Sequence, residues 1–383
     1  MTTLGPICSF LNGGTPSRGV ARYYQGDVPW ITGADISGPQ ADTARSFITE
    51  EAIRESATNR VPAGTVLLVT RTSVGKVAVA AMELCFSQDI TAITPDPHCL
   101  DTSYLVHFLR TKQPHLERLA RGATIKGVTR ETVANLEIPV LSLPEQRRIA
   151  AILDKADALR AKRRQALAQL DTLLQSTFLD MFGDPVTNPM GWEQCVVGDI
   201  VHAVKDGPHV SPTYAESGVP FLSTRHIKPG EVVWEDLKYI DQDEANRQWK
   251  KCKPEFGDIL YTKGGTTGIA ARVTTSEPFA VWVHVALLKP IVNKVHPIWI
   301  EAMLNSAYCY TQSQRYTHGI ANRDLGLKRM VKIQMYLPPL AEQRCFAAIV
   351  ESIEQQKVSQ RVHFAELDTL FASLQQRAFR GEL

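Results

Sequence analysis

Two segments of the chain have the pattern of long, uninterrupted helices. Residues 145–181 contain neither proline nor glycine, and their apolar positions alternate between spacings of three and four residues, as in a coiled coil. A segment that begins near residue 340 follows the same spacing, although its centre is polar. The two sets of positions are Ile152, Ala156, Leu159, Arg163, Ala166, Leu170, Leu173 and Thr177 in the first segment, and Ile349, Ile353, Gln356, Gln360, His363, Leu367, Leu370 and Leu374 in the second.

The matching spacing predicts that the two helices pack against each other as an antiparallel pair. Arg163 and Gln360 occupy central positions on the predicted contact faces. We hypothesise that these polar side chains fix the register of the pair, as buried polar groups do in some coiled coils. The alternative is an ordinary amphipathic helix that covers a globular core.

The helical segments belong to an internal repeat. The sequence LPEQR at residues 143–147 recurs as LAEQR at residues 340–344, and the offset is 342 − 145 = 197 residues. Further matches at residues 150–152 and 170–173 keep that offset. A fixed offset over about forty residues indicates duplication of a structural unit.

The region before each helix has a mixed pattern. Residues 65–70, 77–80 and 279–283 are short apolar runs typical of strands, whereas residues 104–109 and 298–304 read as amphipathic helices. These regions correspond more loosely, for example VPWI at 28–31 with VPFL at 219–222, and GTVL at 64–67 with GDIL at 257–260.

The expected fold class is therefore α/β (α+β), with two globular domains separated by an antiparallel pair of long coiled-coil helices and related by a pseudo-two-fold repeat. A glycine and a proline after residue 182 end the first helix and begin a turn-rich linker. The predicted segments are 1–142, 143–184, 185–339 and 340–383, in the order domain, helix with linker, domain, helix.

Composition places the chain among globular proteins. It has 383 residues, of which 44% are hydrophobic and 21% charged, and no run of 18 apolar residues. Its first residues lack the features of a signal peptide, so we expect a cytoplasmic protein without a membrane partner. The net charge of +2, from 42 basic and 40 acidic residues, argues weakly against an obvious nucleic-acid binder.

Motifs for catalysis or metal binding are missing from the sequence. Residues 71–76 lack the first glycine of a phosphate-binding loop, and residues 264–268 lack its lysine. The seven cysteines form no C-x-x-C pair, and the histidines are not at ligand spacing, so we expect no metal site. Binding is therefore a better prediction than catalysis.

Several short motifs, taken in order and in duplicate, carry a family resemblance. They are GGTPS at 13–17, GDVPW at 26–30, the EQR sequence at the start of both helices, FGDP at 182–185 and NP at 188–189. With them, essentially the whole chain resembles the specificity subunit of Type I restriction–modification enzymes. The second repeat departs from the first at residues 206–212, DGPHVSP, where the first has GGTPS.

The resemblance implies a DNA sequence-specificity subunit without catalytic activity. Two target-recognition domains would each read one half of a bipartite, asymmetric target in double-stranded DNA, and the helix pair would set the spacing. The implied partners are two modification subunits, which methylate adenine with S-adenosylmethionine, and ATP-driven restriction subunits. No cofactor is expected in this chain. A protein-interaction scaffold that does not bind DNA and a stand-alone enzyme are the alternatives.

Candidate DNA contacts are polar or basic residues in turn-like stretches. Arginine and lysine read guanine, asparagine and glutamine read adenine, and positive side chains near glycine-rich turns bind phosphate. The sequence 224–226 and the pair 322–323 are the stronger candidates, while a solvated surface charge is the alternative for each residue. The candidates are Thr32, Arg71, Thr72, Lys76, Lys126 and Arg130 in the first domain, and Thr224, Arg225, His226, Lys263, Asn322, Arg323 and Lys328 in the second.

The starts of the two helices present apolar positions that could bind a partner protein. We hypothesise that part of this surface receives the modification subunits, and the alternative is packing of the helix onto its own domain. The positions are Leu143, Ile149, Ile152, Leu340, Phe346 and Ile349.

Overall fold

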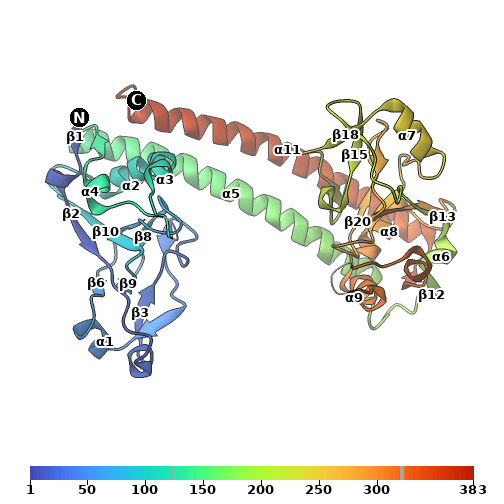
Figure 1. The fold of residues 1–383 in the computed structure, drawn as a ribbon, viewed down its shortest axis with the longest axis horizontal. Coiled ribbons are helices and arrows are strands. Elements are labelled where there is room, and N and C mark those ends of the chain that lie inside the picture. The colour runs from blue at the N-terminus through green and yellow to red at the C-terminus, as the bar shows by residue number, and fades with distance from the viewer. Residues whose placement is uncertain (123–124, 320–322) are drawn as a thin grey trace. The chain divides into compact units, whose positions relative to one another are not determined.

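The computed structural model describes residues 1–122, 125–319 and 323–383. The chain forms two compact units: unit 1 comprises residues 1–164 and 362–383, and unit 2 comprises residues 165–361. Each unit has a mixed region of strands and short helices together with parts of two long helices, α5 (Leu143–Phe182) and α11 (Leu340–Ala378) (Figure 1). None of the described helices is long and apolar enough to cross a membrane.

Unit 1 contains a five-stranded sheet of order β2-β10-β7-β8-β4, a four-stranded sheet of order β5-β3-β9-β6 and a short β1-β11 pair. Its apolar runs form strands whose successive side chains point to opposite faces of a sheet. Where both faces are covered, as for β7, every residue of the strand is buried. The strands are β1 (Thr2–Thr3), β2 (Cys8–Asn12), β3 (Val28–Ile31), β4 (Gln40–Ala41), β5 (Ser46–Ile48), β6 (Asn59–Val61), β7 (Val66–Val69), β8 (Val77–Ala80), β9 (Leu84–Phe86), β10 (Ile90–Pro95) and β11 (Glu137–Ile138). The short helices are α1 (Glu50–Arg54), α2 (Thr102–Thr111), α3 (Gln113–Leu119) and α4 (Arg130–Ala134).

Unit 2 has a related topology, with the sheet β13-β22-β19-β20, the sheet β14-β18-β15-β21 and two short pairs, β12-β23 and β16-β17. The strands are β12 (Glu193–Val196), β13 (Val201–Asp206), β14 (Tyr214–Ala215), β15 (Val219–Leu222), β16 (Ile227–Lys228), β17 (Glu231–Val232), β18 (Lys238–Ile240), β19 (Ile259–Thr262), β20 (Ala270–Arg272), β21 (Ala280–Val281), β22 (Val285–Pro290) and β23 (Gln334–Leu337). The short helices are α6 (Val197–Ile200), α7 (Gln242–Trp249), α8 (Pro297–Leu304), α9 (Ala307–Tyr316) and α10 (Leu327–Met330).

The correspondence between the units extends to single strand pairs. In unit 1 the one parallel pairing inside the smaller sheet joins β3 to β9, and in unit 2 it joins β15 to β21. The strands predicted at 65–70 and 77–80 and the helices predicted at 104–109 and 298–304 are present. The mixed helix-and-sheet class and the internal repeat are thus confirmed.

The long helices use only some of the predicted contact positions, since Ala156 and Ile353 are buried but Leu159 and Leu173 are exposed. In unit 1, Leu153 and Ala156 of α5 are buried in one cluster with Phe371 of α11, whereas Leu159 is 46% exposed. In unit 2, Leu173 is 47% exposed while its neighbour Leu174 packs on the core. The predicted phase was wrong at these alternate positions. Neighbouring residues such as Leu173 and Leu174 are both apolar, so the sequence allows either to face inward. Packing on the domain core determines which of the two is buried.

Equivalent ion pairs join the two helices inside each unit. Arg160 Nε lies 2.5 Å from a carboxylate oxygen of Asp368 in unit 1, and Lys357 Nζ lies 2.9 Å from one of Asp171 in unit 2. The repeat offset relates them, since 357 − 160 and 368 − 171 both equal 197. Both pairs join the N-terminal half of one helix to the C-terminal half of the other, so the helices run antiparallel.

The glutamine of each EQR sequence fastens a long helix to its own unit. Gln146 is fully buried: its Oε1 accepts from the Asp101 N–H (2.8 Å), and its Nε2 donates to the carbonyl oxygens of Cys99 (2.8 Å) and Leu141 (2.9 Å). Gln343 does the same with His296, Lys294 and Pro338. The motif recurs because both units satisfy the same buried backbone groups with it.

The linker after α5 is ordered by its own side chains. Gly183 adopts φ 76° just after the helix, a conformation that glycine adopts without strain. Asn188 bonds both the N–H and the carbonyl of Trp192 at 3.0 Å, and the Trp192 indole donates to the Phe182 carbonyl. The FGDP and NP motifs therefore have a structural role in closing this turn.

Candidate nucleic-acid interface

Two segments of unit 1 are joined edge to edge beyond the end of β7. The Thr72 N–H donates to the Lys126 carbonyl (3.0 Å), and the Val128 N–H donates to the Thr70 carbonyl (2.9 Å). A β-bridge between Arg71 and Gly127 lies between these bonds. We call residues 70–72 with 126–128 the paired-loop edge of unit 1.

Unit 2 has the same edge, built by residues 263–265 with 323–325. The Gly265 N–H donates to the Arg323 carbonyl (3.0 Å), the Leu325 N–H donates to the Lys263 carbonyl (2.7 Å), and Gly264 bridges Asp324. Main-chain atoms therefore form an equivalent frame in both units. The side chains on that frame differ, which is the arrangement expected of two readers with different targets.

The tips of the two edges share an unusual backbone conformation. Thr72 and Gly265 both have φ 67°, in the left-handed region. Glycine adopts this region freely, whereas a β-branched residue is strained there. Such strain is often found at functional sites, and Thr72 keeps its side chain exposed at this tip.

The structure brings three of the predicted contacts of unit 1 together. Arg71, Thr72 and Lys126 are all exposed at the paired-loop edge. Lys76 instead donates to the carbonyl of Ile36 (3.3 Å) and is half-buried, and the Arg130 guanidinium lies 5.5 Å from the ring centroid of Phe10.

Thr32 belongs to a turn that both units contain. Its N–H and hydroxyl both donate to Asp35 at 2.8 Å. At the equivalent turn of unit 2, the Ser223 N–H lies 2.9 Å from His226 Nδ1, and Thr224 and Arg225 lie between them. Thus His226 has a turn-forming role in addition to any contact with DNA.

The environment of His226 favours a neutral ring. The histidine is 3% exposed, and Arg225 Nε–H faces its Nε2 at 3.1 Å. Burial, and next the charge of Arg225, lower the pKa of His226 below 6.5. A neutral ring can accept one of the two facing N–H groups, and a protonated ring can accept neither.

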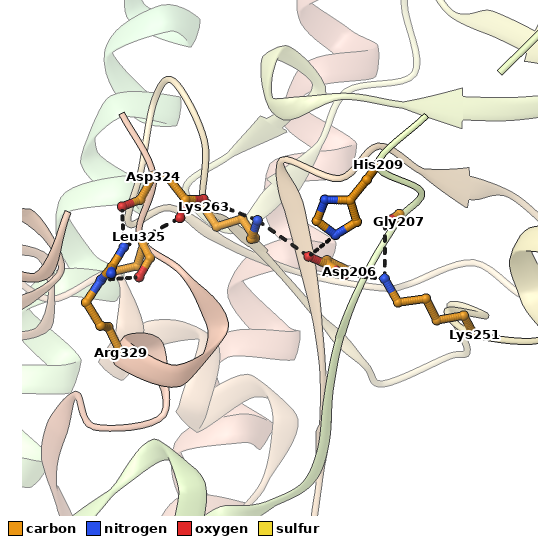
Figure 2. Close-up of polar contacts among 8 residues, drawn as sticks. All are labelled: Asp206, Gly207, His209, Lys251, Lys263, Asp324, Leu325 and Arg329. Carbon is orange, nitrogen blue, oxygen red and sulfur yellow. Dashed lines mark hydrogen bonds and ion pairs between the residues drawn. The ribbon is translucent and has the colours of Figure 1, made fainter. Parts of the chain in front are cut away.

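Lys263, predicted as a DNA contact, is instead buried at 6% exposure in a cluster of charges. Its Nζ lies 3.5 Å from Asp206 Oδ2 and 3.2 Å from Asp324 Oδ1. Figure 2 shows it between the two carboxylates, with Lys251 and His209 beside Asp206 and Arg329 beside Asp324. The prediction of an exposed cation is wrong, because charge in a sequence does not reveal burial.

The Asp206 carboxylate is the most enclosed member of this cluster. Burial alone would raise its pKa, but the hydrogen bond from Lys251 (2.6 Å) and the charges of Lys251, Lys263 and His209 hold the pKa below its ordinary value. Asp206 is thus ionised at neutral pH. Neither Asp206 nor Asp324 is among the residues predicted from the sequence, where the DGPHVSP departure at 206–212 was the available signal.

The remaining candidates of unit 2 are less tightly held. Arg323 is exposed and its guanidinium donates to Gln314 Oε1, and Lys328 is exposed on α10. Asn322 lies outside the described residues. Among the described residues, no group of three or more histidine, cysteine or acidic side chains is arranged to hold a metal ion.

The glycine turns of the two repeats share one feature despite their different sequences. A Cβ on Gly13 would overlap the carbonyl oxygens of Phe86 and Ser87, and one on Gly207 would overlap the carbonyl oxygen of Val281. Each glycine follows the last residue of an equivalent strand, β2 or β13. Both turns need glycine for close backbone approach.

The predicted partner-binding positions divide into two groups. Ile149 is fully buried and Phe346 is 1% exposed, and each packs in the core of its own unit. These two therefore match the core-packing alternative. Ile349 is 41% exposed, and the others, Leu143, Ile152 and Leu340, are half-buried.

Comparison with known proteins identifies the family. The chain matches the model of the Type I restriction modification DNA specificity domain over residues 1–170 and again over residues 189–361. The chain belongs to this family of DNA specificity domains. Specificity subunits are non-catalytic components of Type I systems, and the family supports DNA recognition over the scaffold alternative.

Curated relatives carry the same description. The chain is 28% identical over 308 residues to the MjaIX specificity subunit of Methanocaldococcus jannaschii, covering 74% of this chain and 71% of the relative. It is 31% identical over 183 residues to the EcoR124I/EcoR124II specificity subunit of Escherichia coli, covering 46% and 45%. To the EcoKI specificity subunit of Escherichia coli K12 it is 23% identical, covering 98% and 87%.

Solved structures share the fold. A Type I specificity subunit from M. genitalium matches with a TM-score of 0.61 at 17% identity, covering 99% of this chain and 95% of that one. A chain from a study of complex assembly and conformational transition of the type I system matches with a TM-score of 0.58 at 19% identity, covering 100% and 97%.

Proposed function

We propose that each paired-loop edge is the DNA-reading surface of its unit, and that the two edges read the two halves of an asymmetric, split DNA target. The observation that carries this proposal is the equivalent main-chain frame with different side chains on it. Unit 1 presents Thr72 and Lys126 where unit 2 presents Gly265 and Arg323.

The exposed side chains at the edges have the chemistry for this task. Arginine and lysine donate to guanine in the major groove, and a threonine hydroxyl reads either kind of base. Lysine and arginine near the tip also bind phosphate, which positions the protein without specifying a sequence. Different side chains on one frame then give different half-sites.

The long helices in this proposal set the distance between half-sites and bind two modification subunits. Those subunits would methylate adenine with S-adenosylmethionine, and restriction subunits with ATP would join the complex. Support comes from partly or fully exposed apolar residues at repeat-equivalent positions. Unit 2 presents Ile349 and Leu173, and unit 1 has Ile152 and Leu370 at the same offset.

Sequencing of methylated adenines tests the proposal. The chain is co-expressed with its cognate modification subunits, and genomic DNA of the host is then sequenced for methylation. We expect one asymmetric motif with two specified parts and a spacer of fixed length. A palindromic or continuous motif, or methylation that does not depend on this chain, would contradict the proposal.

A further inference from the structure

We infer that Lys263 is a positioning residue that locks two loops of unit 2 together and so determines the sequence specificity of that unit, without touching DNA. The inference rests on the proposed function of the paired-loop edge. Lys263 joins Asp206, at the end of β13, to Asp324, which lies directly after Arg323 on the edge (Figure 2).

The geometry gives Lys263 little access to a ligand on the outside. Its side chain is 7% exposed, and its ammonium group lies between two carboxylates of its own unit. The backbone around it is also committed: the Lys263 N–H donates to the His284 carbonyl (2.8 Å), and its carbonyl accepts from the Leu325 N–H (2.7 Å). A lysine that binds phosphate needs an accessible ammonium group.

Unit 1 has neutral residues at the positions equivalent to Asp206 and Lys263, so it shows what the main-chain frame is like without these charges. By strand register, Asn12 stands where unit 2 has Asp206, and Thr70 stands where it has Lys263. These neutral side chains are linked through Thr91, with oxygen–oxygen distances of 3.4 Å. The main-chain frame forms in unit 1 without buried charges. The ion pairs of unit 2 are therefore not needed to make the frame.

The added ion pairs instead restrict the two segments next to the edge, which are the turn at residues 207–212 and the segment that contains Asp324. Asp206 leads into the turn at residues 207–212, and Asp324 is bonded by Arg329 as well as by Lys263. A buried lysine between two carboxylates permits few arrangements, because removing either partner leaves an uncompensated charge. The position of Arg323 relative to the 207–212 turn is thereby restricted.

The test uses the chain assembled with its modification subunits and DNA altered in one half-site at a time. Lys263→Met is expected to reduce discrimination at one half-site at least about tenfold, the loss typical of one good base contact. Discrimination at the other half-site should remain within about twofold. Lys251→Met is the matched control, since Lys251 also bonds Asp206 but does not reach the paired-loop edge.

The salt dependence of binding separates positioning from phosphate contact. If Lys263 only positions the loops, Lys263→Met leaves the slope of log K against log salt unchanged. A slope smaller by about 0.9, with equal weakening on all sequences, would mean a phosphate contact and would overturn the inference.

Asp324→Asn provides a second variant, because Asp324 is 46% exposed at its side chain and its replacement is isosteric. This change makes the edge more positive, so a simple electrostatic effect would strengthen binding. If Lys263 positions the two loops through Asp324, Asp324→Asn should instead reduce discrimination at the same half-site as Lys263→Met. Asp324→Glu should restore part of that discrimination. Unchanged discrimination by Asp324→Asn would overturn the inference. A wild-type complex that discriminates no sequence would instead refute the proposed function.

Discussion

Residue-scale constraints are clearest at Thr72, where the chain keeps a strained backbone that a glycine would relieve. Its counterpart in the other repeat is Gly265, with the same φ of 67°. Both donate the same kind of main-chain hydrogen bond. The threonine is therefore not needed for the turn, and its side chain is the feature that differs between the two tips.

Thr72→Gly should increase the stability of unit 1 and reduce its sequence discrimination. Relief of roughly 1–3 kcal/mol of backbone strain is partly offset by about 0.5–1 kcal/mol of extra chain entropy for glycine, so we expect a net gain of about 1 kcal/mol. Thermal unfolding and binding to altered half-sites measure the two effects. Gly265→Thr is the reciprocal control and should destabilise unit 2. A less stable Thr72→Gly variant would contradict this account.

Acid should weaken reading by unit 2 through protonation of His226. A histidine with a pKa lower in the folded chain contributes stability above its ordinary pKa of 6.5, and that contribution is lost as the pH falls below 6.5. Protonation of His226 would break the turn bond from Ser223. We expect discrimination at one half-site to be constant above pH 6.5 and to decline as the pH falls below 6.5.

His226→Asp provides the control for this pH dependence, because unit 1 makes the same turn with Asp35. Burial raises the pKa of Asp35, but its bonds from Arg45 and Thr32 outweigh this and hold the pKa below the ordinary value. The variant should keep the turn, and its half-site discrimination should no longer decline at acid pH. An identical pH profile for wild type and variant would rule out His226 as its source.

At this scale the sequence reveals the type of each residue but not its surroundings in the folded chain. Arg71, Thr72 and Lys126 were chosen because they lie in turn-like stretches, and the structure leaves all three exposed. Lys263 was misassigned because its neutralising carboxylates, Asp206 and Asp324, are distant in the sequence and meet it only in the folded unit. Burial is set by tertiary packing, which residue type alone does not encode.

Among the elements, the long helices depend on single buried residues as well as on their apolar faces. Gln343 offers two hydrogen-bonding groups to three buried backbone groups at the start of α11. Gln146 repeats this at α5. Apolar contacts are not directional, so they allow a helix to shift slightly on its unit. The hydrogen bonds of the glutamine are directional and therefore fix the position of the helix.

Gln343→Leu should destabilise unit 2 by on the order of 3 kcal/mol, because it leaves buried backbone donors and acceptors unsatisfied. Urea denaturation of wild type and variant measures the change. Gln169→Leu, at an exposed site of α5 in the same unit, is the matched control and should shift stability by less than about 0.5 kcal/mol. Equal effects of the two substitutions would show that the buried bonds contribute little.

The helices themselves were predictable from the sequence, and their packing phase was not. Residues 145–181 contain no helix breaker, and α5 covers Leu143–Phe182. The inward face could not be chosen because Leu173 and Leu174 are both leucines, and only Leu174 contacts the core of unit 2. The repeat offset was the more reliable signal, since it also relates the ion pairs of Arg160 and Lys357.

For the whole molecule, the net charge of +2 is a sum over buried and exposed residues alike. In the cluster around Asp206, for example, Lys263 is buried between two carboxylates, whereas Lys251 remains half exposed. Total charge therefore measures the exposed reading surface poorly. The sequence revealed a duplicated chain, but the division of each helix between two units follows from packing.

Assembly with the modification subunits should depend on the exposed apolar residues of the helices. Ile349→Glu is expected to weaken binding of one modification subunit at least about tenfold, because burial of an isoleucine contributes roughly 1.5–3 kcal/mol and a buried charge adds a penalty. Mass measurement of the purified complex would show loss of one subunit. Val292→Glu, 71% exposed in a turn of unit 2, is the control. A complete complex with Ile349→Glu would count against this surface.

The main-chain frame of the paired-loop edge gives the protein unusual evolutionary freedom. Its bonds use N–H and carbonyl groups that every residue except proline carries. Proline at the four donors, Thr72, Val128, Gly265 and Leu325, would remove a bond of the frame, and a side chain at Gly264 would overlap His284. Other substitutions at the exposed positions can alter what is read while the turn stays folded. Selection can then replace one target sequence by another in single steps, each through a folded intermediate.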